Sequence, residues 1–351
     1  MARRFDQVSL RVHSRRTFLR ETSVAFTGLV VGACQTPDDA AVVEHSAAIE
    51  PLSTNEEFYV VWFQGQAGEI DLDQWTCAIQ REGQSVIDLD WDFFESLEIE
   101  QREHTLQCIE SRPGLERMNN ACWTGLPLRE VLAAAGVEIA GGNFIRFACA
   151  DGYSMALPIS DLETPVWLIW GMNGDPLPLD HGFPVRVLMP GRFGWLNPKQ
   201  ITEIDFIDDP YRLPWLESLL SWLDAQGLTM DQDERSMIYQ VQTLVVDPQD
   251  IYLVDEGQKV EILGKAYAGS DPVCQVEVST DGGECWECAE LTYAPGPDRW
   301  TLWRFEWTPE CAGTYQVELR CMTESGAETD PEAPLNHIPW SGGMSVEVEV
   351  V

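Results

Sequence analysis

Basic side chains are scarce in this sequence: 22 lysines and arginines face 58 aspartates and glutamates, and the formal net charge is −36. Lysine occurs only three times, as Lys199, Lys259 and Lys265. The phosphates of nucleic acids and anionic lipid headgroups repel a chain with such an excess of carboxylates. We therefore expect neither a nucleic-acid partner nor adsorption to an anionic membrane surface. The acidic coat is interpreted as a solvated surface, as in proteins from saline habitats.

Long apolar runs are also missing. Near the N-terminus the apolar run from Val24 to Val31 is well short of the roughly 20 residues that span a bilayer. It lies in "SRRTFLRETSVAFTGLVVGAC", residues 14–34, which has a basic start, an apolar middle and small residues before a cysteine. The pair Arg15 and Arg16 is typical of the twin-arginine export route. An export signal is therefore favoured over a transmembrane anchor.

The end of this stretch, "LVVGAC", resembles a lipobox, in which Cys34 becomes the lipidated first residue of the mature protein. We expect residues 1–33 to be a signal peptide and residues 34–54 to be a flexible acidic tether. Without the signal peptide the net charge is −40. The expected location is that of a lipoprotein facing the periplasm or the cell exterior, bound to the membrane through its lipid only.

A metal-binding cysteine cluster is lacking as well, although the sequence holds ten cysteines. "CWEC", from Cys285 to Cys288, has the spacing of zinc and redox motifs, but no second CxxC follows and no histidine lies nearby. Strand geometry would also point these two cysteines to opposite faces. The motif is interpreted as a local disulfide or as free thiols, in a chain whose export permits disulfides.

The sequence pattern divides the chain into two domains. Residues 55–208 mix strands with short helices: Asp90 is placed to cap one helix, and "PLREVLAAAG", 127–136, has the proline and glycine of a second. After a connector, 209–240, short alternating runs separated by turn residues fill 241–351 and predict an immunoglobulin-like β-sandwich. The expected fold class is α+β.

The chemistry of the first domain centres on "HTLQCIESRPG", in which Cys108 ends a predicted strand and enters a loop with Arg112. A cysteine there could be a nucleophile, a metal ligand or a buried core residue, and the last is the commonest role of a free cysteine. A cysteine nucleophile needs a supporting histidine. Only His104 and His181 lie in this domain, and neither is in a protease motif.

Several blocks in order resemble the sulfite oxidase family of molybdenum enzymes. They are "NEEFYVVWF", "TLQC", "CWTGLPLREVLAAAGV", "DGYSMALPI" and "MNGDPLPLDHGFPVRVLMPG", followed in the second half by "VEVSTDGGECW" and "WRFEWTP". The resemblance runs from about Asn55 to the C-terminus. It implies a mixed α/β molybdopterin-binding domain followed by an immunoglobulin-like dimerisation domain, and hence a homodimer.

The resemblance also implies a cofactor, molybdenum held by the dithiolene of one molybdopterin and by one protein cysteine. Cys108 matches the position of that ligand, and a soft thiolate suits the metal. Tyr153 matches a tyrosine near the metal's equatorial oxygen and is the second candidate catalytic residue. The implied cofactor-binding residues, some of them cradling its phosphate, are His181, Arg186, Gly194, Asn197 and Lys199.

The sequence departs from the family where sulfite oxidases place arginines around the metal. Val61, Pro113 and Leu196 occupy those positions, and Phe63 replaces a histidine, although Arg112 is kept. Each lost charge-assisted hydrogen bond is worth roughly 1.5–3 kcal/mol. We therefore expect poor binding of the sulfite dianion.

The remaining pocket is expected to be aromatic, with contributions from Trp62, Phe63, Trp123, Phe193 and Trp195, although such residues also build cores. It suits a small, largely uncharged sulfur or oxo-compound, such as a sulfoxide. The alternatives are a periplasmic methionine sulfoxide reductase-like enzyme and a catalytically degenerate binding module.

The implied cofactor also explains the export signal. In the family the cofactor is inserted in the cytoplasm, so a loaded protein has to cross the membrane folded, as the twin-arginine route allows. No CxxCH haem motif occurs in the sequence, so we expect a separate electron carrier, such as a cytochrome. The expected chemistry is two-electron oxygen-atom transfer.

Overall fold

The computed structural model describes residues 49–62, 65, 68–139, 141–163, 165–208, 229–230, 242–247, 253–293, 296–333, 337–338 and 340–351. The predicted signal peptide, Cys34 and most of the predicted tether and connector lie outside the described residues, as does Phe63. The division of the chain at these segments therefore stays a prediction.

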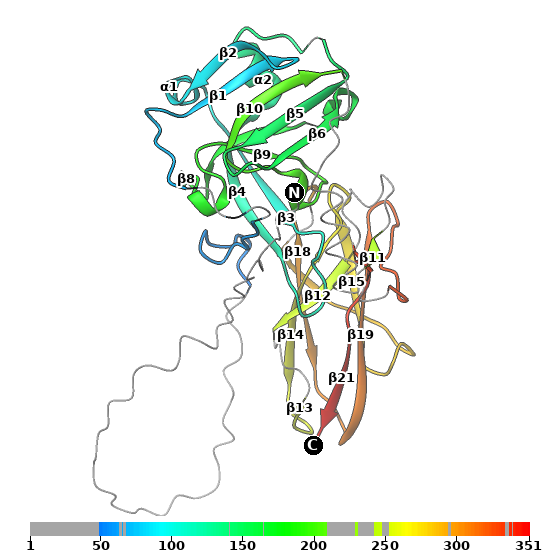
Figure 1. The fold of residues 1–351 in the computed structure, drawn as a ribbon. Coiled ribbons are helices and arrows are strands. Elements are labelled where there is room, and N and C mark those ends of the chain that lie inside the picture. The colour runs from blue at the N-terminus through cyan, green and yellow to red at the C-terminus, as the bar shows by residue number, and fades with distance from the viewer. Residues whose placement is uncertain are drawn as a thin grey trace, which may run out of the picture. The chain divides into compact units, whose positions relative to one another are not determined.

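Two antiparallel hairpins and one parallel pairing build the first sheet, whose strand order is β2-β1-β10-β5-β6 (Figure 1). Strand β1 pairs in parallel with β10, and the other neighbours are antiparallel. Apolar side chains of β1, β5 and β10 belong to one core cluster. Buried and less buried residues alternate along β5, as expected of a strand with one face toward the core. The strands are β1 Thr76–Arg81, β2 Gln84–Asp90, β5 Phe144–Cys149, β6 Ser154–Pro158 and β10 Ile201–Ile207.

Both predicted helices form. Helix α1, Trp91–Glu95, is capped by Asp90, whose carboxylate accepts a 2.9 Å hydrogen bond from the Phe93 amide. Helix α2, Leu128–Ala134, begins after Pro127 and is followed by Gly136 at φ +72°, a conformation that glycine adopts at little cost. Its buried face consists of Leu128, Val131 and Leu132.

A second sheet positions two of the residues singled out in the sequence, Cys108 and Arg186. Its strand order is β3-β4-β7-β8, and β9 pairs with β7. Strand β3 ends at Gln107, directly before Cys108, and β9 begins at Arg186. Every residue of β7 is buried. The strands are β3 Glu100–Gln107, β4 Met118–Pro127, β7 Trp167–Met172, β8 Asp175–Pro176 and β9 Arg186–Leu188.

The C-terminal part is a β-sandwich, as predicted. One sheet has the order β12-β14-β18-β17 and the other β13-β21-β19-β15-β16 (Figure 1). Apolar residues of both sheets share one core cluster. The strands are β12 Gln242–Asp247, β13 Leu253–Val254, β14 Val260–Tyr267, β15 Val273–Ser279, β16 Glu287–Cys288, β17 Glu290–Tyr293, β18 Thr301–Trp307, β19 Gly313–Thr323 and β21 Ser345–Val350. A small parallel pair joins β11, Thr229–Met230, to β20, His337–Ile338.

The expected α+β class describes this fold only in part. The described residues are mostly strands, and their α-helices are the short α1 and α2. None of the helices among these residues has the length and apolar character needed to cross a membrane. Cys285 and Cys288, for which a disulfide or free thiols had both been open, are exposed free thiols.

Candidate functional site

His181 ends the short 3₁₀ helix η3, Leu179–His181, and is 4% exposed. Its Nε2 lies 2.7 Å from the backbone oxygen of Asn55, to which a neutral imidazole donates. Burial lowers the pKa of His181, although the hydrogen bond to Asn55 acts in the opposite direction. The imidazole is therefore neutral at pH 7, and it fixes the segment around Asn55 against η3.

Arg186 is 3% exposed at the start of β9. Its Nη1 donates to the backbone oxygen of His181 at 2.8 Å and its Nη2 to that of Asn197 at 3.2 Å. The guanidinium carbon lies 5.1 Å from the ring centroid of Trp123. The buried Arg186 guanidinium thus connects, through hydrogen bonds, the segments of His181 and Asn197, two residues predicted to bind the cofactor.

Lys199 completes this group. Its Nζ donates to the backbone oxygens of Val61 at 3.1 Å and Asp180 at 2.9 Å, and lies 3.5 Å from the ring centroid of Trp62. Burial, with a further contribution from the charge of Arg186, lowers the pKa of Lys199 to about 7. Among the described residues no carboxylate forms an ion pair with this ammonium. A very acidic chain therefore contains a cationic centre that suits an anion.

Gly182 lets these groups approach one another. Its φ is +116°, and a Cβ placed there would lie 2.9 Å from the Cβ of Arg186 and 3.2 Å from that of Lys199. Real Cβ atoms essentially never lie as close as 2.9 Å to another heavy atom, and the left-handed φ also disfavours a side chain, so glycine is the residue that fits here.

Gly194 links this centre to the Cys108 strand. It begins the 3₁₀ helix η4, Gly194–Leu196, and a Cβ at Gly194 would lie 2.7 Å from the Tyr59 hydroxyl and 3.5 Å from the backbone oxygen of Gln107. The turn is thus packed against the residue that precedes Cys108. Close backbone approach, the usual reason for a glycine at a ligand site, is observed here.

Tyr153 and Asn197 both donate hydrogen bonds to backbone oxygens at or next to the η4 turn. The Tyr153 hydroxyl donates to the backbone oxygen of Trp195 at 2.6 Å, and burial raises the pKa of this phenol. The Asn197 amide donates to the backbone oxygens of Arg192 and Phe193, at 3.0 and 2.8 Å, and accepts from the Met189 amide. The Asn197 amide thus holds the loop, and its role as a cofactor-binding residue stays a prediction.

Cys108 lies half-buried at the start of the loop between β3 and β4. Its amide donates to the backbone oxygen of Arg117 at 2.9 Å, and its sulfur lies 3.8 Å from Glu110 Oε2. The Glu110 carboxylate in turn forms a 2.5 Å ion pair with Arg117 Nη1. Burial, followed by the charge of Glu110, raises the pKa of the thiol to about 11. A metal cation is the kind of partner that would deprotonate it.

Glu110 and Arg117 were missed by the sequence reasoning. The signal was present, because an acidic residue stands two positions after Cys108 and an arginine nine positions after it. Sequence spacing alone does not show that the loop folds back and brings both side chains to the thiol.

Val61, Pro113 and Leu196, which stand where sulfite oxidases place arginines, have different surroundings in the structure. Val61 is half-buried and its carbonyl accepts from Lys199, whereas Leu196 is 7% exposed and packs in the core cluster of the first sheet. Pro113 is half-buried in the Cys108 loop. Arg192 faces Asp161 at 3.8 Å, so it does not replace the lost charges here.

Two of the aromatic residues expected to line the pocket are core residues. Trp123 is fully buried, donates through Nε1 to the His104 backbone oxygen at 2.9 Å and packs edge-on against Phe58. Phe193 is also fully buried. Trp62, by contrast, lies over Lys199, and Trp195 is half-buried, so these two remain candidates for contact with a ligand.

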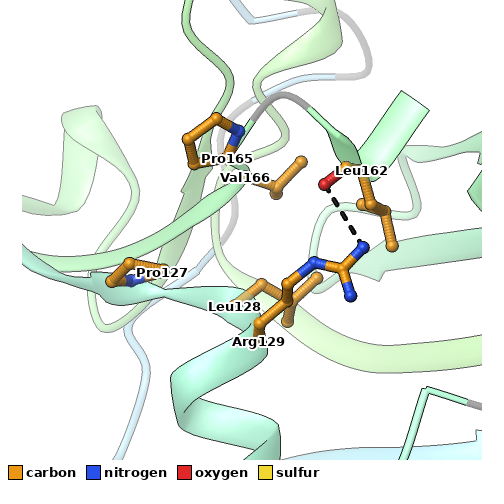
Figure 2. A pocket seen from close by; sticks show the side chains of 6 residues that line it. All are labelled: Pro127, Leu128, Arg129, Leu162, Pro165 and Val166. Carbon is orange, nitrogen blue, oxygen red and sulfur yellow. Dashed lines mark hydrogen bonds between the residues drawn. The ribbon is translucent and has the colours of Figure 1, made fainter. Parts of the chain in front are cut away.

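A separate pocket lies where β4 meets α2 (Figure 2). It has a volume of about 30 Å³, enough for about one or two water molecules. Its lining consists of Pro127, Leu128, Arg129, Leu162, Pro165 and Val166. Arg129 reaches across it to the Leu162 backbone oxygen at 3.4 Å. None of the candidate cofactor residues lines it, so we assign it no part in the site.

Comparisons with known proteins identify both domains of the chain. The family model described as an oxidoreductase molybdopterin binding domain matches residues 64–215, and the Mo-co oxidoreductase dimerisation domain matches residues 234–333. Human mitochondrial sulfite oxidase is 30% identical over 269 residues, which cover 65% of this chain and 48% of that protein. The NADPH nitrate reductase of Fusarium oxysporum is 27% identical, covering 50% of this chain and 22% of that protein.

The crystal structure of the sulfane dehydrogenase SoxCD from Paracoccus pantotrophus shares the fold. Its TM-score is 0.68 at 18% identity, covering 81% of this chain and 77% of that chain. The chain spans about half the length of the curated relatives it matches.

The half-buried Cys108 thiol follows Gln107, against which the Gly194 turn packs, and the Arg186–Lys199 centre adds positive charge. A thiol and a cationic centre of this kind suit a soft metal attached to an anionic group. With both domains matched, the chain belongs to the molybdopterin-binding oxidoreductases of the sulfite oxidase family, and its cofactor is molybdenum bound to molybdopterin. The residues present fit this group. Cys108 offers the soft ligand, and Arg186 and Lys199, which approach one another at Gly182, offer charge to a phosphate.

The pKa of Lys199 leads to a prediction for the cofactor-free protein. Its folded pKa, about 7, lies below the ordinary value of 10.5. Between these values the unfolded chain binds more protons, so this group makes stability rise with pH from about 7 to 10, by at most about 1.4 kcal/mol per pH unit. Below pH 7 both states are protonated and the dependence ends.

Thermal unfolding of wild type and Lys199→Met across this pH range measures the effect. The variant should lose the rise with pH, whereas Lys259→Met, at an exposed lysine paired with Glu306, should keep it. Identical curves for wild type and Lys199→Met would contradict the assigned pKa.

Proposed function

We propose that this protein is an exported oxidoreductase that carries out two-electron oxygen-atom transfer on a small, largely uncharged sulfur or oxo-compound, and that sulfite is a poor substrate. The cofactor, when bound, supplies the redox and oxygen-transfer chemistry. The protein supplies a ligand, a phosphate cradle and a pocket whose charge selects the substrate.

In this proposal each segment of the site has one task. Cys108 holds the metal as its thiolate. Arg186 and Lys199 hold the phosphate. Lys199 forms no ion pair with an acid in the part of the chain that the structure describes, and Gly182 lets the two cationic side chains approach one another. Neutral His181 fixes the segment that contains Val61 and Trp62, through Asn55. Tyr153, which donates to Trp195 here, sets the η4 turn and holds a proton at the edge of the site.

The charge around Cys108 is the observation that carries the choice of substrate. Val61 and Pro113 stand where sulfite oxidases place guanidiniums, and Leu196 at the third position is packed in the core. In addition, the Glu110 carboxylate lies 3.8 Å from the Cys108 sulfur, and it is already paired with Arg117. A dianion approaching this thiolate therefore gains little from Arg117 and loses roughly 1.5–3 kcal/mol for each missing charge-assisted bond. A neutral sulfoxide has no such penalty.

Steady-state kinetics of the loaded enzyme test this proposal. Artificial electron donors and acceptors allow both directions to be measured. The kcat/KM for reduction of a neutral sulfoxide should exceed the kcat/KM for oxidation of sulfite. The apparent KM for sulfite should be high. Efficient oxidation of sulfite at low concentration would contradict the proposal, and would assign the anion site to Arg112 or Arg117.

A second candidate is the repair of oxidised methionine in exported proteins. It is favoured by the same uncharged pocket together with the predicted export signal, because methionine sulfoxide is a neutral sulfoxide. A methionine sulfoxide-containing peptide that is turned over faster than the free sulfoxide would support it, and equal or slower turnover would count against it.

We also propose a homodimer formed by the C-terminal sandwich, in line with the matched dimerisation domain. Because both subunits are strongly acidic, salt should tighten the dimer by screening. Light scattering that shows a monomer at high concentration in molar salt would exclude it.

A separate electron carrier, such as a cytochrome, completes the proposed cycle, and its reduction or oxidation by the loaded enzyme can be followed by absorbance.

Export remains a proposal based on the sequence. The arginine pair and lipobox predict a mature chain that begins at lipidated Cys34. Intact-mass analysis of the membrane fraction should show the loss of residues 1–33 and the added lipid, and Arg15→Lys with Arg16→Lys should prevent both. An unprocessed, unlipidated chain in wild-type cells would rule this route out.

A further inference from the structure

The loop that carries Cys108, residues 108–117, is closed on itself. The Cys108 amide donates to the Arg117 backbone oxygen at 2.9 Å, which joins the two ends of the loop. Inside it, Arg112 and Leu115 exchange backbone hydrogen bonds of 3.2 and 2.9 Å. Such a closed turn moves as a unit, so the position of the Cys108 sulfur depends on what holds the two strand ends, β3 and β4.

Lys265 of the sandwich strand β14 holds the exit of this loop. Its Nζ donates to the Met118 backbone oxygen at 3.1 Å and lies 3.3 Å from Glu116 Oε2. Lys265 is 7% exposed, and its Nζ is 5.5 Å from the ring centroid of Trp300. A buried ammonium is strongly destabilising unless it is paired and hydrogen-bonded. Both of these partners belong to the end of the Cys108 loop, so the lysine and the loop constrain one another.

The sandwich also holds the entrance of the loop. The Tyr267 hydroxyl donates to the Thr105 backbone oxygen at 3.0 Å, and the Trp300 amide donates to Thr105 Oγ1 at 2.8 Å. Thr105 is fully buried on β3, three residues before Cys108. Both contacts therefore fix the end of the strand that leads to the thiol.

An apolar cluster fills the space between these polar contacts. Ile109 follows Cys108 directly, and Phe193 precedes Gly194 of the η4 turn. Both pack with side chains from the sandwich, and the full buried cluster is Ile109, Met118, Phe193, Tyr267, Trp300, Leu302 and Trp340. The sandwich is thus in contact with two of the segments that form the candidate site.

We propose that Lys265 is a positioning residue for Cys108, so that the C-terminal sandwich sets the geometry of the metal-binding loop in addition to any role in dimerisation. The proposal rests on the proposed function in one respect, the assignment of Cys108 as the metal ligand. It predicts that loss of the Lys265 ammonium loosens the loop locally while the rest of the fold is kept.

The reactivity of the Cys108 thiol in the full-length, cofactor-free protein measures this directly. Protein from a host that does not make the cofactor is treated with iodoacetamide, and labelling is read at each cysteine by peptide mass spectrometry. Lys265→Met should raise the labelling rate of Cys108 about tenfold, as expected of a local opening. Cys77 and Cys149, which are buried in the first sheet, should stay as slow as in wild type.

Three further variants complete the design. Lys265→Arg keeps the charge and should restore most of the protection of Cys108. Lys259→Met, the control at an exposed sandwich lysine, should leave its labelling unchanged. If Lys265→Met does not fold, Glu116→Gln weakens the same pair from the loop side and should also raise labelling at Cys108.

An unchanged Cys108 rate in Lys265→Met and Glu116→Gln would overturn the proposal. So would an equal rise at Cys77 and Cys149, because it would show general loosening of the fold. Labelling of loaded wild type separates this inference from the proposed function. If Cys108 is no better protected there than in the cofactor-free protein, the ligand assignment fails, whatever the Lys265 variants show.

Discussion

Replacing Cys108 with alanine should abolish activity and remove the Mo(V) paramagnetic signal, while the protein still folds. We propose this cysteine as the soft ligand of the candidate site, and loss of even an outer partner of a metal ligand lowers affinity or activity by about 10- to 100-fold. Loss of the ligand itself should lower activity by at least about 100-fold. Metal analysis, electron paramagnetic resonance and turnover on the purified variant measure the effect.

Cys122→Ala is the matched control. Cys122 is also half-buried, and burial raises the pKa of its thiol as it does at Cys108, but Cys122 lies within β4. This variant should keep the molybdenum and the signal. If Cys108→Ala turns over substrate at the wild-type rate, the metal is held elsewhere and the assignment of the site fails.

Restoring positive charge beside the site should change the choice of substrate. Val61→Arg combined with Pro113→Arg should raise kcat/KM for sulfite by about 10- to 100-fold, since one regained charge-assisted hydrogen bond is worth roughly 1.5–3 kcal/mol. Turnover of a neutral sulfoxide should change little. Leu196 is left out of the design because it packs in the core, where an arginine would be buried without a partner.

Val60→Arg is the control for added charge at large, since Val60 is exposed next to Val61. It should leave both substrates nearly unaffected. The gain for sulfite in the double variant should shrink as ionic strength rises, because the attraction is electrostatic. A gain of the same size in Val60→Arg, or equal gains for both substrates, would show that these positions do not form the anion pocket.

Much of the fold could be predicted from the sequence because its local signals agree with its tertiary structure. Asp90 caps α1, Pro127 and Gly136 bound α2, and the alternating runs of the second half form the sandwich. The α+β class was only partly right, since helices are short and few among the described residues. A short helical pattern shows that a helix forms, but it does not show how small a share of the fold the helices make up.

The site was predicted as a set of residues and less well as a set of contacts. His181, Arg186 and Lys199 do meet, because Gly182 and the backbone of β9 bring them together. The tasks of Asn197 and Trp123 were not visible, since both depend on backbone groups that lie several residues or a whole strand away. A sequence motif records which side chains are present, whereas hydrogen bonding decides which of them are free for a ligand.

Contacts between distant segments were beyond sequence reasoning. Glu110 and Arg117 meet Cys108 because the loop closes, and Lys265 reaches Met118 across 147 positions of sequence. No periodicity or spacing predicts such pairs. They are nevertheless the contacts that set the charge and the position of the thiol.

The most direct test of this account is the molybdenum and pterin content of wild-type protein, purified folded from a host that makes the cofactor. The account predicts about one molybdenum and one molybdopterin per chain, both lost in Cys108→Ala or held there without the Mo(V) signal of the wild type. Folded wild-type protein that contains neither molybdenum nor pterin would contradict it.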